Sequence, residues 1–393
     1  MKKYNSKILT LCSLVFGTFV LTSFFSCDGV IFDTIRDEVE LDDAEISGDI
    51  QSIIRYTLDG VEHIFVSTGE IYHRSVATNV NRNGEEVEDF ADSVANSKID
   101  WDSFSTPRGF VYSLAADSTN LYAASVVIEE DDDGYNVGTE RNLYCYDGSK
   151  WNKIWTASYS SSNAAILFCT NSPKPENREA YFRYGKKIWK LSGTTELSDD
   201  SAQYVYKASA TDSSGNALSS IGTELSAEDE NSTAINVTSC AKLGGTTYFS
   251  SAYAMTTNES PDSDATYIYY SSGDNVYYSN DGSTWTAVDL SCDTIYSLGV
   301  TYDYLLAGTD SGIVHTTWAS ENIPSAGNSD FDTNADSTLS SYYEIPAILV
   351  IDSSRHETTG TIYASSVTSS SSASLNNVGL WSYYASEGEW NRE

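Results

Sequence analysis

The sequence predicts an all-β protein in which one antiparallel unit of four strands is repeated along the chain. The clearest unit is the stretch 269–288, which reads as strands 275–279 and 284–288 joined by the tight turn Asn280-Asp281-Gly282. Asn and Gly tolerate positive φ, and an Asp side chain accepts bonds from nearby amides, so this turn is typical of a hairpin. Charged residues make up only 20% of the chain, and abundant Tyr, Ser and Thr favour sheet over helix.

Short apolar lines of sequence recur at long intervals. Val111-Tyr-Ser-Leu-Ala matches Ile295-Tyr-Ser-Leu-Gly almost letter for letter, and two further lines occupy 165–169 and 236–240. These four lines align at Ala115, Cys169, Cys240 and Gly299, with steps of 54, 71 and 59 residues. Steps of that size with only strand patterns between them predict a β-propeller.

The repeat also predicts the number of blades. Units begin near residues 50, 110, 164, 235, 294 and 344, which indicates six blades of four antiparallel strands; a seventh would have to lie within 190–234. A pair of β-sandwiches is the rival architecture, but it does not explain the recurring lines. We therefore divide the chain into a signal peptide (1–26), an acidic tether (27–48) and a propeller (49–393), and interpret polar segments such as 129–141 as loops.

Crowding around a propeller axis explains the small residues at the aligned positions. We expect Cys169 and Cys240 to be buried, inert thiols of the innermost strands. Export permits disulfides among Cys145, Cys169, Cys240 and Cys292, and their pairing stays open because four cysteines allow three connectivities. No CxxC or Cys/His cluster supports a zinc site.

Two turns carry a recognisable motif. Ser-x-Asp281-Gly282-x-Thr-Trp285 resembles the Asp-box, or BNR-like repeat, of bacterial β-propellers, with one residue fewer than the usual spacing. Asp147, Gly148 and Trp151 repeat it, since Asp again precedes Trp by four residues. The resemblance implies a structural clasp at the outer part of a blade, in which Asp binds amides of its own hairpin and Trp packs under the turn.

The first residues read as an export signal. Lys2, Lys3 and Lys7 precede an uncharged run from 8 to 25, and Phe24-Phe25-Ser26-Cys27 resembles the relaxed lipobox of spirochaete lipoproteins. The resemblance implies lipid attachment at Cys27 and an exported protein tethered to the cell envelope, on its periplasmic face or at the cell surface. The alternative is an uncleaved anchor, because the run is just long enough to span a bilayer.

The net charge of the chain indicates which classes of ligand it can bind. The net charge of −34 at pH 7 repels phosphate backbones, so we expect no nucleic acid ligand. Asp131, Asp133 and Asn136 are spaced loosely like calcium ligands, but the closing acid comes too early for an EF-hand loop, and a solvated loop is the simpler interpretation. We therefore expect no cofactor, with calcium as the alternative.

The function that fits these features best is binding, without catalysis. We expect a binding module for an envelope protein or a glycan, and no catalytic residue is proposed. Because Asp-box proteins include sialidases, a sialidase-like hydrolase is one alternative; it would have to bring Arg and carboxylates together at the propeller axis. A structural or assembly subunit of an envelope complex is the other.

Overall fold

The computed structural model describes part of the chain: residues 45–46, 48–50, 52–76, 101–160, 165–169, 175–184, 187–199, 203–204, 210–212, 233–234, 252–259, 266–272, 274–279, 285–301, 303–320, 323–331, 339, 343–351, 361–368, 378–384 and 389–393. The predicted signal peptide, Cys27 and most of the tether lie outside these residues. Within them, no helix combines the length and the apolar character that crossing a membrane requires.

The described strands form six sheets, numbered here in chain order. Sheet 1 contains β1 (Ile53–Leu58), β2 (Val61–Ser67), β3 (Ile71–Ser75) and β4 (Asp102–Phe104). Sheet 2 contains β5 (Phe110–Ala116), β6 (Leu121–Glu130), β7 (Asn136–Tyr146) and β8 (Trp151–Ser158). Sheet 3 contains β9 (Ala165–Cys169), β10 (Ala180–Tyr184), β11 (Lys187–Lys190), β12 (Gln203–Tyr204) and β14 (Thr233–Ala234), with the 3-10 turn η1 (Pro175–Asn177) before β10.

The second half of the chain repeats this plan. Sheet 4 contains β13 (Ala210–Asp212), β15 (Ala252–Glu259), β16 (Thr266–Ser272), β17 (Asn275–Ser279) and β18 (Trp285–Asp289). Sheet 5 contains β19 (Ile295–Val300), β20 (Tyr304–Thr309), β21 (Gly312–Ser320), β22 (Ile323–Pro324) and β23 (Ser329–Asp330). Sheet 6 contains β24 (Tyr343–Glu344), β25 (Ile348–Ile351), β26 (Thr361–Thr368), β27 (Gly379–Tyr384) and β28 (Glu389–Arg392).

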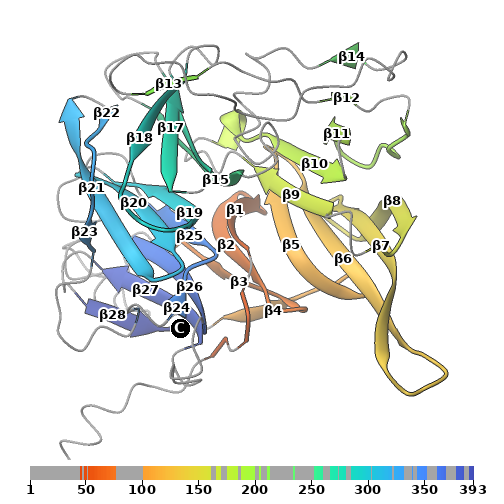
Figure 1. Cartoon of the computed structure of the whole chain (residues 1–393). Coiled ribbons are helices and arrows are strands. Elements are labelled where there is room, and N and C mark those ends of the chain that lie inside the picture. The colour runs from red at the N-terminus through yellow and green to blue at the C-terminus, as the bar shows by residue number, and fades with distance from the viewer. Residues whose placement is uncertain are drawn as a thin grey trace, which may run out of the picture. The chain divides into compact units, whose positions relative to one another are not determined.

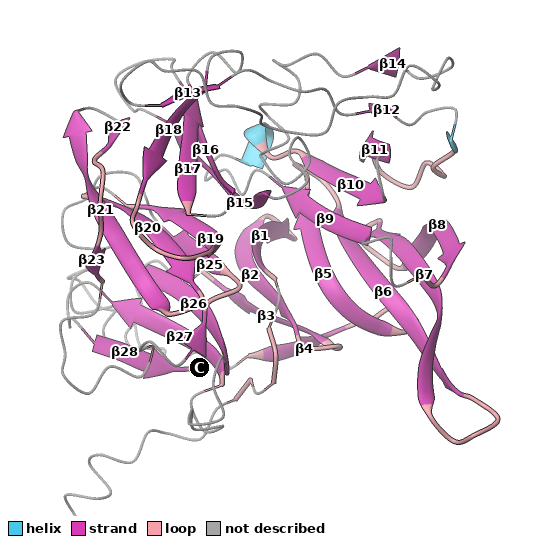
Figure 2. Cartoon of the chain, in the orientation of Figure 1, coloured by secondary structure: helices cyan, strands magenta, loops and turns pink. Residues whose placement is uncertain are grey.

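The sheets follow one another around a common centre, with the first long strand of each on the inside (Figures 1 and 2). The inner strands contact one another in sequence, β1 with β5, β5 with β9, β15 with β19 and β19 with β25, and β25 also contacts β1. This is the β-propeller that the sequence predicts. Six blades stay a prediction, because the stretch between sheets 3 and 4 lies largely outside the described residues.

One assignment from the sequence needs correction and another is not tested. The innermost described strand of sheet 4 is β15, and residues 236–240, expected to form an innermost strand, lie outside the described residues. The segment 129–141, interpreted as a loop, is mostly strand: β6 extends to Glu130 and β7 begins at Asn136. The polar composition of this segment does not indicate a strand, but its residues pair across the hairpin and are therefore strand.

Three serine hydroxyls, two on inner strands and one directly before β1, connect a sheet to the next one. Ser52 Oγ lies 3.1 Å from the Leu114 carbonyl oxygen, Ser113 Oγ donates to Leu167 over 3.4 Å, and Ser297 Oγ donates to Ile345 over 2.7 Å. Ser113 and Ser297 belong to the two Tyr-Ser-Leu lines of the repeat, and the register shifts just before each of them. A β-bulge re-aims a side chain, so the repeated line encodes a bulge that directs the hydroxyl at the next sheet.

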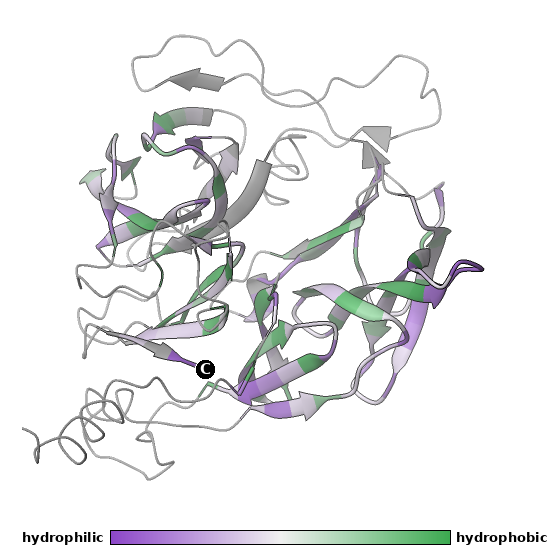
Figure 3. Cartoon of the chain, turned by 60° about the horizontal axis from the view of Figure 1, so that its bottom comes forward, coloured by the Kyte–Doolittle hydropathy of each residue, from purple (hydrophilic) through white to green (hydrophobic). Residues whose placement is uncertain are grey.

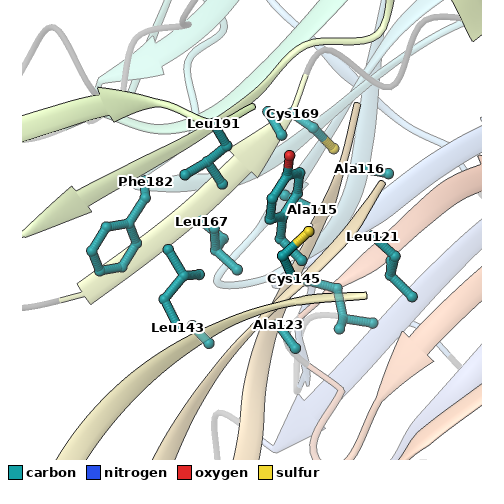
Figure 4. Packing of buried hydrophobic residues seen from close by; sticks show 14 of the residues in the cluster. Ala115, Ala116, Leu121, Ala123, Leu143, Cys145, Leu167, Cys169, Phe182 and Leu191 are labelled. Atoms are coloured by element: carbon teal, nitrogen blue, oxygen red, sulfur yellow. The ribbon is translucent and has the colours of Figure 1, made fainter. Parts of the chain in front are cut away.

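The inner strands are as crowded as the sequence predicts. Ala115 is fully buried, and a Cβ at Gly299 would lie 2.8 Å from methyl carbons of both Ile348 and Val350. Cys145 is a buried, free thiol, and Cys169 is also buried; both pack among apolar side chains (Figure 4). Burial is the main reason that the pKa of Cys145 is raised to about 12, which keeps this thiol protonated and inert.

Sheets 1 and 6 close on each other through apolar and charged contacts. Ile53, Ile64 and Val66 share one core cluster with Leu349 and Tyr363. Hydrophobic (green) and hydrophilic (purple) residues alternate along the strands in the hydropathy colouring of Figure 3. The carboxylate of Glu393, which follows β28, accepts from Arg74 Nη1 at 2.5 Å and from Trp101 Nε1 at 3.1 Å. Closure therefore combines hydrophobic burial with a largely buried ion pair.

A methyl group at Gly308 is expected to disturb the junction of sheets 5 and 6. Its Cβ would lie 2.2 Å from Ser297 Oγ and 2.6 Å from the Ile345 carbonyl oxygen, so the backbone itself must shift. We expect Gly308→Ala to lower the free energy of unfolding by about 1–3 kcal/mol in urea denaturation. The control is Ser311→Ala, which alters an exposed side chain in the next turn; equal stability of the two variants would contradict the close approach.

Candidate functional site

Two buried arginines converge on one carboxylate. Arg55, on β1, places Nη1 3.0 Å from Glu62 Oε1, and Arg178, just before β10, places Nη2 2.8 Å from Glu62 Oε2. The arginine side chains are 5% and 1% exposed and that of Glu62 is 25% exposed. Arg178 Nη1 also reaches Thr57 Oγ1 at 3.4 Å. We call Arg55, Glu62 and Arg178 the arginine cluster.

The arginine cluster joins three sheets near the propeller axis. Glu62 and Thr57 belong to sheet 1, whereas Arg178 directly precedes β10 of sheet 3, so the contact connects two sheets that sheet 2 separates along the chain. Arg55 Nη2 donates to the Val350 carbonyl oxygen of sheet 6 over 2.6 Å. The tight β1–β2 turn brings Arg55 on β1 close to Glu62 on β2. Its two central residues, Asp59 and Gly60, have φ of 51° and 83°, as a two-residue hairpin turn of type I′ requires.

The arginine cluster forms ion pairs within the protein, and we call this role an internal tie. Each carboxylate oxygen of Glu62 receives one guanidinium, so both arginines direct nitrogens at the protein's own acid. Arginine and carboxylate do meet near the axis, which is the juxtaposition that a sialidase-like hydrolase would need. However, both arginine side chains are nearly inaccessible to solvent, and the site holds sheets together instead of presenting cations to a ligand.

Neutralising Glu62 is expected to destabilise the propeller strongly. Glu62→Gln leaves two buried cations beside an uncharged amide, and loss of one partner from a buried pair costs about 3 kcal/mol or more of unfolding free energy. The measurement is urea denaturation followed by tryptophan fluorescence. Glu70→Gln, an exposed glutamate of the same sheet, is the control; a loss no larger than in that control would show that the arginine cluster contributes little.

The Asp147 turn makes the hydrogen bonds typical of a clasp. Asp147 Oδ1 accepts from the amides of Ser149 and Lys150, both at 3.0 Å, and Oδ2 accepts from Asn152 Nδ2 at 2.8 Å. Hydrogen bonding to the charged form, first of all from the Ser149 hydroxyl, holds the pKa of Asp147 well below its usual range. Gly148 has φ of 91°, which glycine adopts without strain.

Trp151 connects this turn to the preceding sheet. Its Nε1 donates to the Ser105 carbonyl oxygen at 2.7 Å, and its ring lies 6.4 Å from Phe104 and 5.3 Å from Tyr146. Of the other predicted clasp, Asp281 and Gly282 lie outside the described residues, and so does the side chain of Trp285. Trp285 itself begins β18, as expected for the fourth strand.

The same aromatic arrangement recurs between sheets 5 and 6. Phe331 lies 5.0 Å from Tyr383 and 6.3 Å from Trp390, and Tyr383 lies 5.3 Å from Trp390. The corresponding distance from Phe104 to Tyr146, between sheets 1 and 2, is also 5.0 Å. Trp390 thus occupies the position of Trp151, although its turn lacks the Asp of the motif.

A histidine completes each aromatic cluster. The His73 ring lies 5.2 Å from Phe104, and the His315 ring lies 5.9 Å from Phe331. Both follow an isoleucine by two residues on the third strand, Ile71 and Ile313, a signal that inspection of the sequence missed. Burial is the main reason that the pKa values of both histidines are lowered.

The charged surroundings of the two histidines differ. His73 Nδ1 also lies 3.0 Å from His63 Nδ1, an approach that requires at least one of these rings to be neutral. The carboxylate of Asp102 partly offsets the lowering of the His73 pKa. Next to His315, backbone hydrogen bonds at Asp330 and Ser329 and the charge of Asp330 act in the same direction as Asp102.

Acid is expected to weaken both sheet junctions. A pKa lowered from 6.5 means that the folded protein binds fewer protons than the unfolded chain, so this stabilisation is complete above 6.5 and is lost as the pH falls below it. We expect the free energy of unfolding to drop as the pH falls from about 6.5 to about 5. His73→Gln combined with His315→Gln is expected to flatten that dependence in urea denaturation; an unchanged slope would assign it to other groups.

The predicted calcium residues belong to a tight hairpin turn. Asp131 Oδ1 accepts from the amides of Asp133 at 3.0 Å and Tyr135 at 2.9 Å, so this carboxylate shapes the turn. Asn136 begins β7 and pairs with Glu130 across the hairpin. In the part of the chain that the structure describes, no three His, Cys, Asp or Glu side chains are grouped to hold a metal ion.

Comparison with known proteins gives only distant likenesses. No protein-family model and no curated protein matches the chain. Among solved structures, Sqt1 of Saccharomyces cerevisiae shares 9% identity over 87% of this chain and 97% of its own, with a TM-score of 0.38. The N-terminal part of BBS1, in complex with ARL6, shares 9% identity over 87% and 80%, with a TM-score of 0.40.

A third solved structure is a catalytically inactive variant of an enzyme. Virginiamycin B lyase from Staphylococcus aureus, with quinupristin, shares 10% identity over 87% of this chain and 96% of its own, with a TM-score of 0.36. Such scores carry no argument about ligand or activity. The propeller assignment rests on the strand pairing and the inner-strand contacts of this chain.

Proposed function

We propose that this chain is an exported lipoprotein, anchored to the cell envelope through Cys27, whose propeller is a binding module for an envelope protein or a glycan. The observation that carries the proposal is the arginine cluster, in which Glu62 forms ion pairs with both Arg55 and Arg178. A sialidase-like hydrolase would need such arginines to face a substrate carboxylate. Their use as an internal tie favours a rigid disc that binds through its outer surface.

The binding function is tested by affinity purification of the anchored, full-length protein from mildly cross-linked membranes. We expect one envelope protein to be recovered reproducibly and in near-stoichiometric amount, as for a stable subunit of a complex. Recovery of the chain alone would contradict a protein partner. Glycan binding and glycosidase assays on the same preparation would then decide between the glycan and the hydrolase.

The anchor is tested separately by labelling cells with palmitate. Because the acyl groups of a bacterial lipoprotein are attached at the lipobox cysteine, we expect Cys27→Ala to abolish labelling and to release the protein from membranes. The matched control is Cys12→Ala, which changes a cysteine within the apolar run. Label that survives in Cys27→Ala would show that Cys27 does not carry the lipid.

A further inference from the structure

The hairpin of β6 and β7 extends beyond its neighbouring strands. The pairing of β5 with β6 starts at Val126, and the pairing of β7 with β8 ends at Glu140. Residues 127–139, which we call the arm, therefore form a two-stranded ribbon with no further strand paired to either side among the described residues (Figures 1 and 2). Such a ribbon is marginally stable by itself, so its order depends on contacts at its tip and its base.

Apolar side chains lie exposed on the arm and at its base. Ile128 is 47% exposed, Tyr135 at the tip 70%, Val137 38%, and Tyr159 at the base 41%. They account for most of the large hydrophobic residues that are exposed in the described part of the chain; the others are Val61 and Phe110. Ile128 pairs with Gly138 and Val137 pairs with Glu129, so these two apolar side chains lie on opposite faces of the arm. Apolar side chains exposed on both faces of one projecting element are typical of a protein-binding surface.

The arm is ordered before any partner arrives. At the tip, the Asp131 amide donates to the Tyr135 carbonyl over 2.8 Å, and Gly134, with φ of 83°, donates to the Asp131 carbonyl over 3.0 Å. At the base, the Tyr159 ring covers Gly138, where a Cβ would lie 2.8 Å from a ring carbon. The Arg141 guanidinium lies 4.6 Å from the centre of the same ring. A preformed surface loses little conformational entropy on binding.

Charge selects the kind of partner. Five consecutive acids, Glu129 to Asp133, precede the exposed tyrosine of the tip. Arg108 approaches Glu129 at 3.6 Å, but both side chains are more than half exposed, so solvent screens the pair. A second copy of this chain, with its net charge of −34, would be repelled, whereas a cationic surface would be attracted.

We propose that the arm docks into a partner protein that surrounds an apolar recess with lysine and arginine side chains. Tyr135 enters the recess, Ile128 and Val137 contact its walls from the two faces of the arm, and the acids at the tip pair with the cationic rim. Tyrosine suits the central position, because its large, rigid side chain loses little entropy when buried. The inference rests on the proposed function, of which it specifies the surface and the partner.

The test is photo-cross-linking of the full-length, anchored protein in its own cells, with p-benzoylphenylalanine in place of Tyr135. We expect one covalent adduct whose cross-linked peptide, identified by mass spectrometry, comes from a lysine- and arginine-rich surface. The same photo-reactive residue in place of Val61, which is 49% exposed outside the arm, is the matched control and is expected to give no such adduct.

Charge dependence is measured with Glu129→Gln, Glu130→Gln, Asp132→Asn and Asp133→Asn combined, which leaves Asp131 to shape the turn. We expect the yield of adduct to fall by about tenfold or more. Urea denaturation shows whether this variant folds like the parent. Ile128→Thr with Val137→Thr, which keeps every charge, is expected to lower the yield through lost apolar contact.

Several outcomes would overturn the proposal: an adduct with a second copy of this chain, an adduct with lipid, a yield that ignores the charge variant, or no adduct. The result for the parent protein in cross-linked membranes separates this failure from failure of the proposed function. If an envelope protein is recovered equally with the parent and with both arm variants, the binding function stands and the arm is not its surface. If the parent recovers no protein, the function itself fails.

Discussion

The close approach of inner strands around the axis is the constraint on which the rest of the structure depends. Strands that converge on a centre leave room for only small side chains, such as Ala115, and at Gly299 for none. The same proximity brings a serine hydroxyl within reach of the neighbouring backbone, so one residue both fits and donates a hydrogen bond. A repeated Tyr-Ser-Leu line meets both requirements, which explains its near identity in sheets 2 and 5.

Farther from the axis the sheets diverge, and aromatic rings fill the widening space. Two junctions use the same set of rings, with His and Phe from one sheet and Tyr and Trp from the next. Edge-to-face contacts of this kind add to the energy of burial and fix the angle between neighbours. Trp390 keeps its place without the motif aspartate, so the ring contacts are the more general device and the aspartate turn a local addition.

Local patterns predicted the fold, whereas contacts between distant residues produced the site. Strand β17 was predicted from its hairpin, and β5 and β19 from the repeated Tyr-Ser-Leu lines. The arginine cluster was not predicted from the sequence, because Glu62 and Arg178 are separated by 116 positions and neither belongs to a motif. The arm was missed for a different reason: its acids have low strand propensity, and only pairing across the hairpin makes them strands.

The distribution of charge connects the interior to the surface. Arg55, Arg74 and Arg178 are buried against Glu62 and Glu393, so arginines of an acidic chain serve closure of the propeller. Some cations at the surface are paired with acids as well, as Lys153 is with Glu140 and Lys190 with Glu179. A cationic protein that approaches the arm therefore meets a surface on which negative charge predominates. Electrostatics thus performs two separate tasks: inside, ion pairs fix the sheets, and outside, excess acid selects what the protein binds.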